Sequence, residues 1–163
     1  MVEVKVNIDA KSVAYLKKLS DMPKEVPAAI QRGLDEGLQI VKQNLQERRL
    51  SGQGPYPSSE HRLGVITGLL HASVYTSTVV QGNKVIGRIG SDVPYAGVHE
   101  YGMVISAKNA PFLVFKVLGK TVRTKTVTIP ERAPFRTEVE SAESAQIISD
   151  AIAREVLELG TEE

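Results

Sequence analysis

The stretch from Lys24 to Leu50 constrains the fold most, because its apolar residues recur with the period of an α-helix. Polar residues occupy the opposite face, so the expected helix must bury one side against another layer of structure. Gly33 and Gly37 lie beside the apolar stripe, where they indicate either close approach by another element or fraying of the helix. The stripe that we expect to be buried against a sheet consists of Ile30, Leu34, Leu38, Val41 and Leu45.

The rest of the chain predicts an α+β fold, in which the long helix and a C-terminal helix pack on one face of an antiparallel sheet. Strands are expected where β-branched residues alternate with polar ones, and turns where Gly, Pro and Asn cluster. Two segments are expected to project from the core: a long loop over 51–64 and a strand-turn-strand insertion over 112–129, which forms a protruding β-hairpin. In chain order, we first expect a strand over 2–8, helices over 11–19 and 24–50, and a short helix capped by Thr67. Next we expect strands over 73–81 and 84–90, helical turns over 95–101 ended by Gly102, and strands over 112–118 and 121–129. A last helix is expected over 138–159, where the apolar residues at helical spacing are Ala142, Ala145, Ile148, Ile152, Val156 and Leu159.

The composition is that of one globular domain spanning residues 1–163. The apolar fraction of 42% and the charged fraction of 24% are close to globular averages. No segment approaches the run of about 18 apolar residues that a membrane span needs. The N-terminus lacks the apolar region of a signal peptide, so we expect synthesis in the cytoplasm and no contact with a membrane.

Residues suited to catalysis or metal binding are sparse. The chain has no cysteine, and His61, His71 and His99 lie apart without the spacing of a metal site. Glu100 follows His99 directly, but neighbours on a helical turn do not face each other. The glycine and serine residues match neither a phosphate-binding loop nor a nucleophile elbow. We therefore expect no enzymatic activity, no metal and no cofactor.

Charge is distributed unevenly along the second half of the chain. Residues 103–136 hold seven basic residues against one acid, whereas residues 137–163 hold one basic residue against eight acids. Such blocks bear on association rather than on fold. They pair either within one subunit or between neighbours in an assembly, and the sequence leaves both possibilities open.

The candidate interaction site is a basic cluster on the expected hairpin, in which Arg123 and Lys125 are two residues apart on one strand face. No acid lies between Glu100 and Glu131 to neutralise it. Three interpretations stay open: a solvated face, a contact with another protein, or a contact with the phosphate backbone of nucleic acid. Few aromatic side chains accompany the cluster, so reading of a base sequence is not expected. Its members are Lys116, Lys120, Arg123 and Lys125.

Four blocks of the sequence, in this order, resemble a protein family of tailed bacteriophages. Residues 63–74 (LGVITGLLHASV) resemble its threonine-glycine-x-leucine-x-x-serine segment, and residues 89–102 (IGSDVPYAGVHEYG) resemble its tyrosine-alanine signature, which ends in an acidic residue, an aromatic residue and glycine. Residues 113–130 resemble its strand-turn-strand insertion, and residues 133–135 (APF) resemble its closing element. The family comprises tail-completion and head–tail joining (neck) proteins, also called virion morphogenesis or minor tail components. Its signature residues here are Tyr95, Ala96, His99, Glu100, Gly102, Pro134 and Phe135.

The resemblance implies a structural virion protein without enzymatic activity. Such a protein assembles into a ring, expected to be a hexamer, at the neck or at the head-proximal end of the tail. Its implied partners are further copies of itself, the tail terminator or tail tube protein, and head-closure, adaptor or portal-side neck proteins. DNA that passes through the channel is a further partner that the resemblance allows.

Two other classes of function are alternatives to a structural role. The first alternative is a nucleic-acid-binding module that acts through the basic hairpin from Lys116 to Lys125. The second is a small hydrolase or nuclease, for which the sequence offers no constellation of catalytic residues. In the structural interpretation the tyrosine signature has a plain role, because hydrogen bonds from His99 and Glu100 hold the loop that Gly102 reverses.

Overall fold

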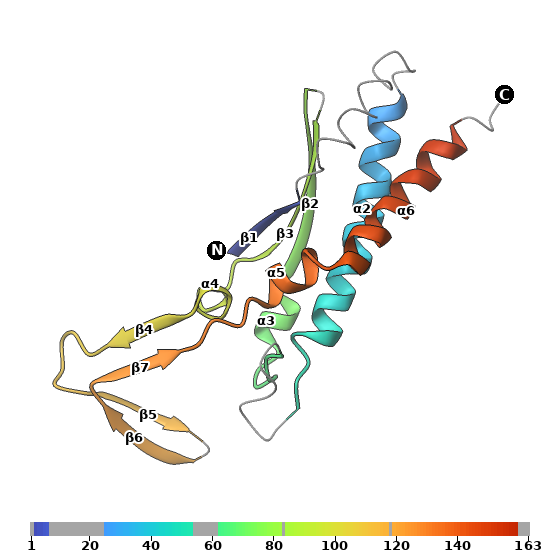
Figure 1. Cartoon of the computed structure of the whole chain (residues 1–163). Helices are drawn as coiled ribbons and strands as arrows, with labels where there is room; N and C mark the ends of the chain where they lie inside the picture. The colour runs from blue at the N-terminus through green and yellow to red at the C-terminus, as the bar shows by residue number, and fades with distance from the viewer. Residues whose placement is uncertain (1, 7–24, 54–61, 83, 118, 160–163) are drawn as a thin grey trace.

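The computed structural model describes residues 2–6, 25–53, 62–82, 84–117 and 119–159. It is an α+β structure in which a long helix and the C-terminal helix pack together beside small antiparallel sheets (Figure 1). The helix expected over 11–19 and residues 54–61 of the long loop lie outside the described residues. The elements are β1 (Val2–Val6), α2 (Glu25–Arg48), α3 (Leu69–Ala72), β2 (Val74–Gln81), β3 (Lys84–Ser91), α4 (Ala96–Tyr101), β4 (Met103–Ser106), β5 (Leu113–Val117), β6 (Lys120–Thr124), β7 (Thr126–Ile129), α5 (Pro134–Val139) and α6 (Ala142–Glu158).

The main sheet has three antiparallel strands in the order β1-β3-β2. β2 and β3 form the expected hairpin, and Gly82 turns the chain with a φ of 58°, a conformation that glycine adopts without strain. β1 pairs with the other edge of β3, from Val2 opposite Ser91 to Val6 opposite Gly87. The N-terminal strand is therefore confirmed over residues 2–6.

The long helix α2 is the centre of the core. The expected stripe is buried: Leu38, Val41 and Leu45 are fully covered, and Leu34 is 1% exposed. This stripe packs against β2 and β3 on one side of the helix, while α6 packs along a second side (Figure 1). Burial of several large apolar side chains supplies the main stabilisation of such a core.

The two glycines of α2 allow the backbone of α6 to come close. A Cβ atom at Gly33 would lie 2.5 Å from Ile152 Cα, and one at Gly37 would lie 2.9 Å from Ile148 Cα. These distances leave no room for a side chain on either glycine. Close approach by another element, rather than fraying, is thus the reason for the glycine pair, and the sequence had left this open.

The C-terminal helix differs from the single helix expected over 138–159. A break separates α5 from α6, because Ser141 is extended and its hydroxyl accepts a hydrogen bond from the Ser144 N–H at 3.1 Å. Because α6 starts anew after Ser141, a different side of the helix faces the core than the sequence predicted. Ala142 and Ala145, which the sequence placed in the apolar stripe, are exposed. The buried residues of α6 are Ser144, Ile148 and Ala151.

The segment between α2 and α3 closes the base of the long loop. Gly52 and Gly64 form an isolated parallel bridge, with Gly52 N–H donating to the Leu63 carbonyl at 2.9 Å. The short helix α3 is confirmed, but its N-cap is Gly68 rather than the expected Thr67. Gly68 has a φ of 73°, so a residue without a side chain occupies the cap position.

An arm, which we define as residues 103–129, extends away from the other described residues, which we call the body (Figure 1). It contains two separate antiparallel ribbons, β4 with β7 and β5 with β6, instead of one hairpin. The strand expected over 121–129 is therefore wrong as a single element. The chain bends at Lys125, so that β6 pairs with β5 and β7 pairs with β4. The strand β4 was not expected, because its three apolar residues followed by serine do not alternate between apolar and polar.

Candidate functional site

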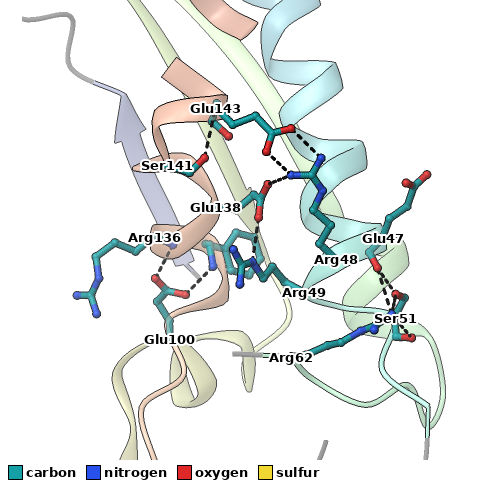
Figure 2. A network of polar contacts seen from close by, with 12 residues as sticks. Glu47, Arg48, Arg49, Ser51, Arg62, Glu100, Arg136, Glu138, Ser141 and Glu143 are labelled. Atoms are coloured by element: carbon teal, nitrogen blue, oxygen red, sulfur yellow. Dashed lines mark hydrogen bonds and ion pairs between the residues drawn. The ribbon is translucent and has the colours of Figure 1, made fainter. Parts of the chain in front are cut away.

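The junction between body and arm is organised by one buried carboxylate. Glu100 lies on α4 and is 1% exposed. Its two oxygens accept hydrogen bonds at 3.0 Å from the backbone N–H groups of Phe135 and Arg136 in the first turn of α5 (Figure 2). Ala133 at the N-cap of α5 has a φ of 43° and offers no side-chain cap. Glu100 thus satisfies the N–H groups that a helix start leaves unpaired.

The backbone ties the two strands of the arm together where they meet the body. The carbonyl of His99 accepts hydrogen bonds from the N–H groups of Arg132 at 2.9 Å and Ala133 at 3.2 Å. Gly102 follows α4 with a φ of 69°, and a Cβ atom there would lie 2.9 Å from the Glu131 backbone nitrogen. Only glycine fits this crossing, so the root of the arm has a defined direction.

Two segments that the sequence presented separately therefore meet in space. The signature of residues 95–102 lies against the closing element of residues 133–135, and Ala96, Pro134 and Phe135 are buried there. The rings of Tyr95 and His99 pack edge to face with centroids 6.3 Å apart. Sequence reasoning named these residues but missed the pairing of Glu100 with α5, because no local pattern relates residues 35 positions apart.

Burial shifts two titrations at the junction in opposite directions. Removal from water raises the pKa of Glu100, and the two backbone N–H donors lower it in part. Burial lowers the pKa of His99, and the positive charge of Arg132 lowers it further. The Nδ1 atom of His99 is buried without a hydrogen-bond partner. A charged imidazolium is therefore disfavoured beside the root of the arm.

The acidic block of residues 137–163 finds partners on α2. Glu138, which is 1% exposed, accepts a hydrogen bond from Arg49 Nε at 2.9 Å. Glu143 is held by two nitrogens of Arg48 at 2.6 and 2.8 Å (Figure 2). Two further pairs join the helices: Arg32 with Glu155 at 2.6 Å, and Arg154 with Glu36 at 2.9 Å. Glu138, Glu143 and Glu155 thus pair with arginines of α2 or with Arg49, the residue that follows it, and not with the arm of their own subunit.

The arm separates its basic residues onto different surfaces. In the β5–β6 register Val114 lies opposite Arg123, which places Arg123 and Lys116 on one face and Lys120 on the other. Lys125 lies at the bend between β6 and β7, so the expectation that it shares a strand face with Arg123 is wrong. The guanidinium of Arg123 stacks over the Phe112 ring at 4.0 Å.

Apolar side chains of the arm stay in contact with water. A two-stranded ribbon has no third layer to cover it, and an isolated hairpin is marginally stable at best. In the β4–β7 ribbon, Met103 lies opposite Ile129 and Ile105 opposite Val127, so one face is entirely apolar. Among the described residues of the arm, the exposed large apolar side chains are Met103 (49%), Val104 (63%), Ile105 (37%), Val114 (65%) and Val117 (48%).

A hollow of about 430 Å³ lies beside the junction, between the segment 63–71 and α4. Its lining is mostly apolar, with Arg132, His71 and His99 as the basic residues and Tyr95 as a phenol. Of the described residues, none that lines this hollow is a carboxylate, and no group of three or more His, Asp or Glu in the described ranges is placed to hold a metal ion. This lining favours apolar contact over acid–base chemistry.

Comparison with known proteins leaves the geometry as the basis for assigning a role. No family model, no curated protein and no solved structure matches the chain. Among the described residues, no helix combines the length and the apolar character that crossing a membrane would require. The arm and its junction are accordingly the candidate site.

Proposed function

We propose that this protein is a structural assembly subunit that joins neighbouring proteins through its arm. The observation that carries the proposal is the arm itself, which projects from the body with five exposed apolar side chains and five basic residues. Met103 and Ile105 share one apolar face of the β4–β7 ribbon with Val127 and Ile129, and monomeric proteins seldom leave such a face uncovered. A segment that has no core of its own gains stability when a partner covers it.

On the basis of the sequence resemblance, we propose that this subunit belongs to the virion of a tailed bacteriophage. On this proposal it forms a ring, a hexamer by that resemblance, at the neck or the head-proximal end of the tail. Its partners are copies of itself, the tail terminator or tail tube, and head-closure, adaptor or portal-side proteins. The proposal is supported by the location of the signature residues, since the blocks at 95–102 and 133–135 meet where the arm leaves the body.

A structural role without catalysis agrees with the character of the site. Glu100, the most buried carboxylate of the junction, is occupied by two backbone N–H groups. His99 lies next to Glu100 in the chain, but its side chain packs on Tyr95. Both residues thus act on the backbone and packing of the junction, which supports a role in holding the arm.

The test is charge reversal on the arm of the protein in its phage. Lys120→Glu with Lys125→Glu is preferred to a change at Arg123, because Arg123 also stacks on Phe112. We expect the variant to fold normally, since isolated surface charges contribute little to stability. Particles should then accumulate as separate filled heads and tails in electron micrographs.

The matched control is Lys42→Glu with Lys84→Glu, which changes the same total charge on the body. We expect joined, infectious particles from this variant. Joined particles from the arm variant as well would contradict the proposal.

A nucleic-acid-binding module is the second candidate function, favoured by the excess of basic residues in the arm. The apolar residues between them argue against it, because a phosphate backbone contacts charge and not exposed valine. Titration with duplex DNA decides the matter. A dissociation constant that rises steeply with salt would support nucleic-acid binding by the arm, and weak binding at low salt would exclude it.

A further inference from the structure

We propose that the arm of one subunit binds the outer face of α6 in a second copy of this chain, around Leu157. The inference rests on the proposed function and names the surface that receives the arm. It starts from a mismatch: the arm is basic and carries exposed apolar side chains, whereas the acidic C-terminal helix of the same subunit extends away from it (Figure 1).

The outer face of α6 carries acidic residues, which the arm lacks. Leu157 is 71% exposed, the largest exposed fraction among the large apolar residues of α6. It borders a shallow hollow of about 380 Å³, which Asp150 and Glu158 also line. The one basic residue there, Arg154, already pairs with Glu36 at 2.9 Å. The hollow therefore places an exposed apolar side chain beside two acidic residues and one basic residue.

The arm complements this surface in charge and shares its apolar character. Val117 is 48% exposed and lies opposite Lys120 in the β5–β6 register, so an apolar side chain and a cation stand on the same face. Opposite charges on two such patches favour one partner and one orientation. Two arms do not suit each other, because each carries five basic residues and no acid between Glu100 and Glu131.

The hollow beside the junction is a poorer receiver for the arm. Ile66 is 86% exposed at its edge, which gives it apolar surface. However, Arg132 lines it and none of its lining residues is acidic, so it would repel the basic residues that accompany Val117. The charge difference between the two hollows is what favours α6.

The contact has to form between two copies. In Figure 1 the arm lies at one end of the molecule and the C-terminal end of α6 at the other, so the two cannot meet within a subunit. A contact between different surfaces of identical subunits is heterologous, and it repeats from copy to copy until a ring closes or a filament grows. The proposed contact therefore accounts for assembly by a single interface.

Disulfide trapping tests this contact cleanly, because the chain has no cysteine of its own. We would combine Val117→Cys with Leu157→Cys in the full-length protein and oxidise it at low salt. A heterologous contact links each copy to the next, so a ladder of dimers and larger species is expected on a non-reducing gel. Reduction should collapse the ladder, and each single-cysteine variant, which has no cysteine opposite its own in this contact, should form no species larger than a dimer.

The matched control is Val117→Cys with Ile66→Cys, which offers the other exposed apolar residue to the same arm position. A ladder from this pair, with none from the 117–157 pair, would overturn the α6 assignment while leaving self-assembly intact. If neither pair yields a ladder and the protein sediments as a monomer at low salt, self-assembly fails as well. If the protein instead binds duplex DNA through the arm, the occupant is nucleic acid and the inference is overturned.

A charge swap provides a second readout that does not depend on cysteine chemistry. Lys120→Glu with Lys125→Glu should weaken self-association by about tenfold or more, because like charges then face each other. Asp150→Lys with Glu158→Lys should weaken it similarly. A mixture of the two variants matches opposite charges at both contacts between unlike subunits, so self-association should reappear in sedimentation. No recovery in the mixture would contradict the proposed pairing.

Discussion

In the body of this protein the apolar stripe of α2 is covered on two sides, whereas in the arm the apolar residues of two ribbons remain exposed. Leu38 is fully buried between sheet and helix, and Val114 on β5 is 65% exposed. Both are apolar residues within regular secondary structure, so the difference in their exposure comes from the number of layers that pack around them. A region that completes its own core is built for stability, and one that does not is built for a partner.

The largest difference between body and arm should appear on truncation of these two residues. Leu38→Ala should lower the free energy of unfolding by about 2–5 kcal/mol, since it removes buried methyl groups and leaves a cavity. Val114→Ala should change it by less than about 0.5 kcal/mol, because its side chain already contacts water. Denaturant unfolding of both variants measures the contrast. Equal losses would mean that the arm is packed like the body.

A second substitution tests how closely the two long helices approach. Gly33→Ala places a Cβ atom 2.5 Å from Ile152 Cα, so the backbone of α6 must move. Overpacking of this kind costs about 1–3 kcal/mol, which outweighs the gain of up to about 1 kcal/mol in helix propensity.

Gly37→Ala is the matched variant, with a nearest backbone contact of 2.9 Å at Ile148 Cα. It should destabilise the protein less than Gly33→Ala in the same thermal or denaturant melt. If Gly33→Ala stabilised the protein instead, α2 and α6 would separate at little cost. The body would then not be tightly packed, and the contrast with the arm would fail.

The junction between the two regions is tested by Glu100→Gln. The amide oxygen of glutamine serves only one of the two N–H groups of Phe135 and Arg136, and its NH2 group faces the other. A buried donor without a partner costs about 1–3 kcal/mol, so the unfolding free energy should fall by that amount. Glu131→Gln removes an exposed ion pair with Arg136 and should cost less than about 1 kcal/mol. Equal effects would contradict the capping role of Glu100.

The smallest expected effect is a pH dependence that originates at His99. Because burial and Arg132 lower the pKa of His99, the unfolded chain takes up a proton on this ring at a higher pH than the folded protein does. Stability from this group is therefore present above pH about 6.5 and is lost as the pH falls through the lowered pKa.

His99→Gln should reduce this loss when denaturation midpoints are compared at about pH 7.5 and about pH 5.5. The raised pKa of Glu100 acts in the opposite sense, since its contribution falls as pH rises, but it is present in both proteins. His71→Gln on α3 is the control and should leave the pH dependence in place. An unchanged pH profile in His99→Gln would show that burial does not lower the pKa of His99.

Local patterns predicted the elements whose reasons are local. The stripe of α2, the hairpin around Gly82 and the end of α4 at Gly102 follow from periodicity and from turn residues, and all three are confirmed. The break at Ser141 was also within reach of local reasoning, because serine at that place is a common N-cap. The continuous apolar spacing from 138 to 159 concealed it.

The sequence by itself determined which parts of the chain become the buried helix and the main hairpin, because hydrophobic period and turn chemistry act over a few residues. Only the tertiary structure decided that Glu100 caps α5, that Glu138 and Glu143 pair with Arg49 and Arg48, and that the strand over 121–129 divides between two partners. Each of these depends on residues distant in the chain. Their pairing is set by the packing of whole elements, and no window of sequence contains both partners.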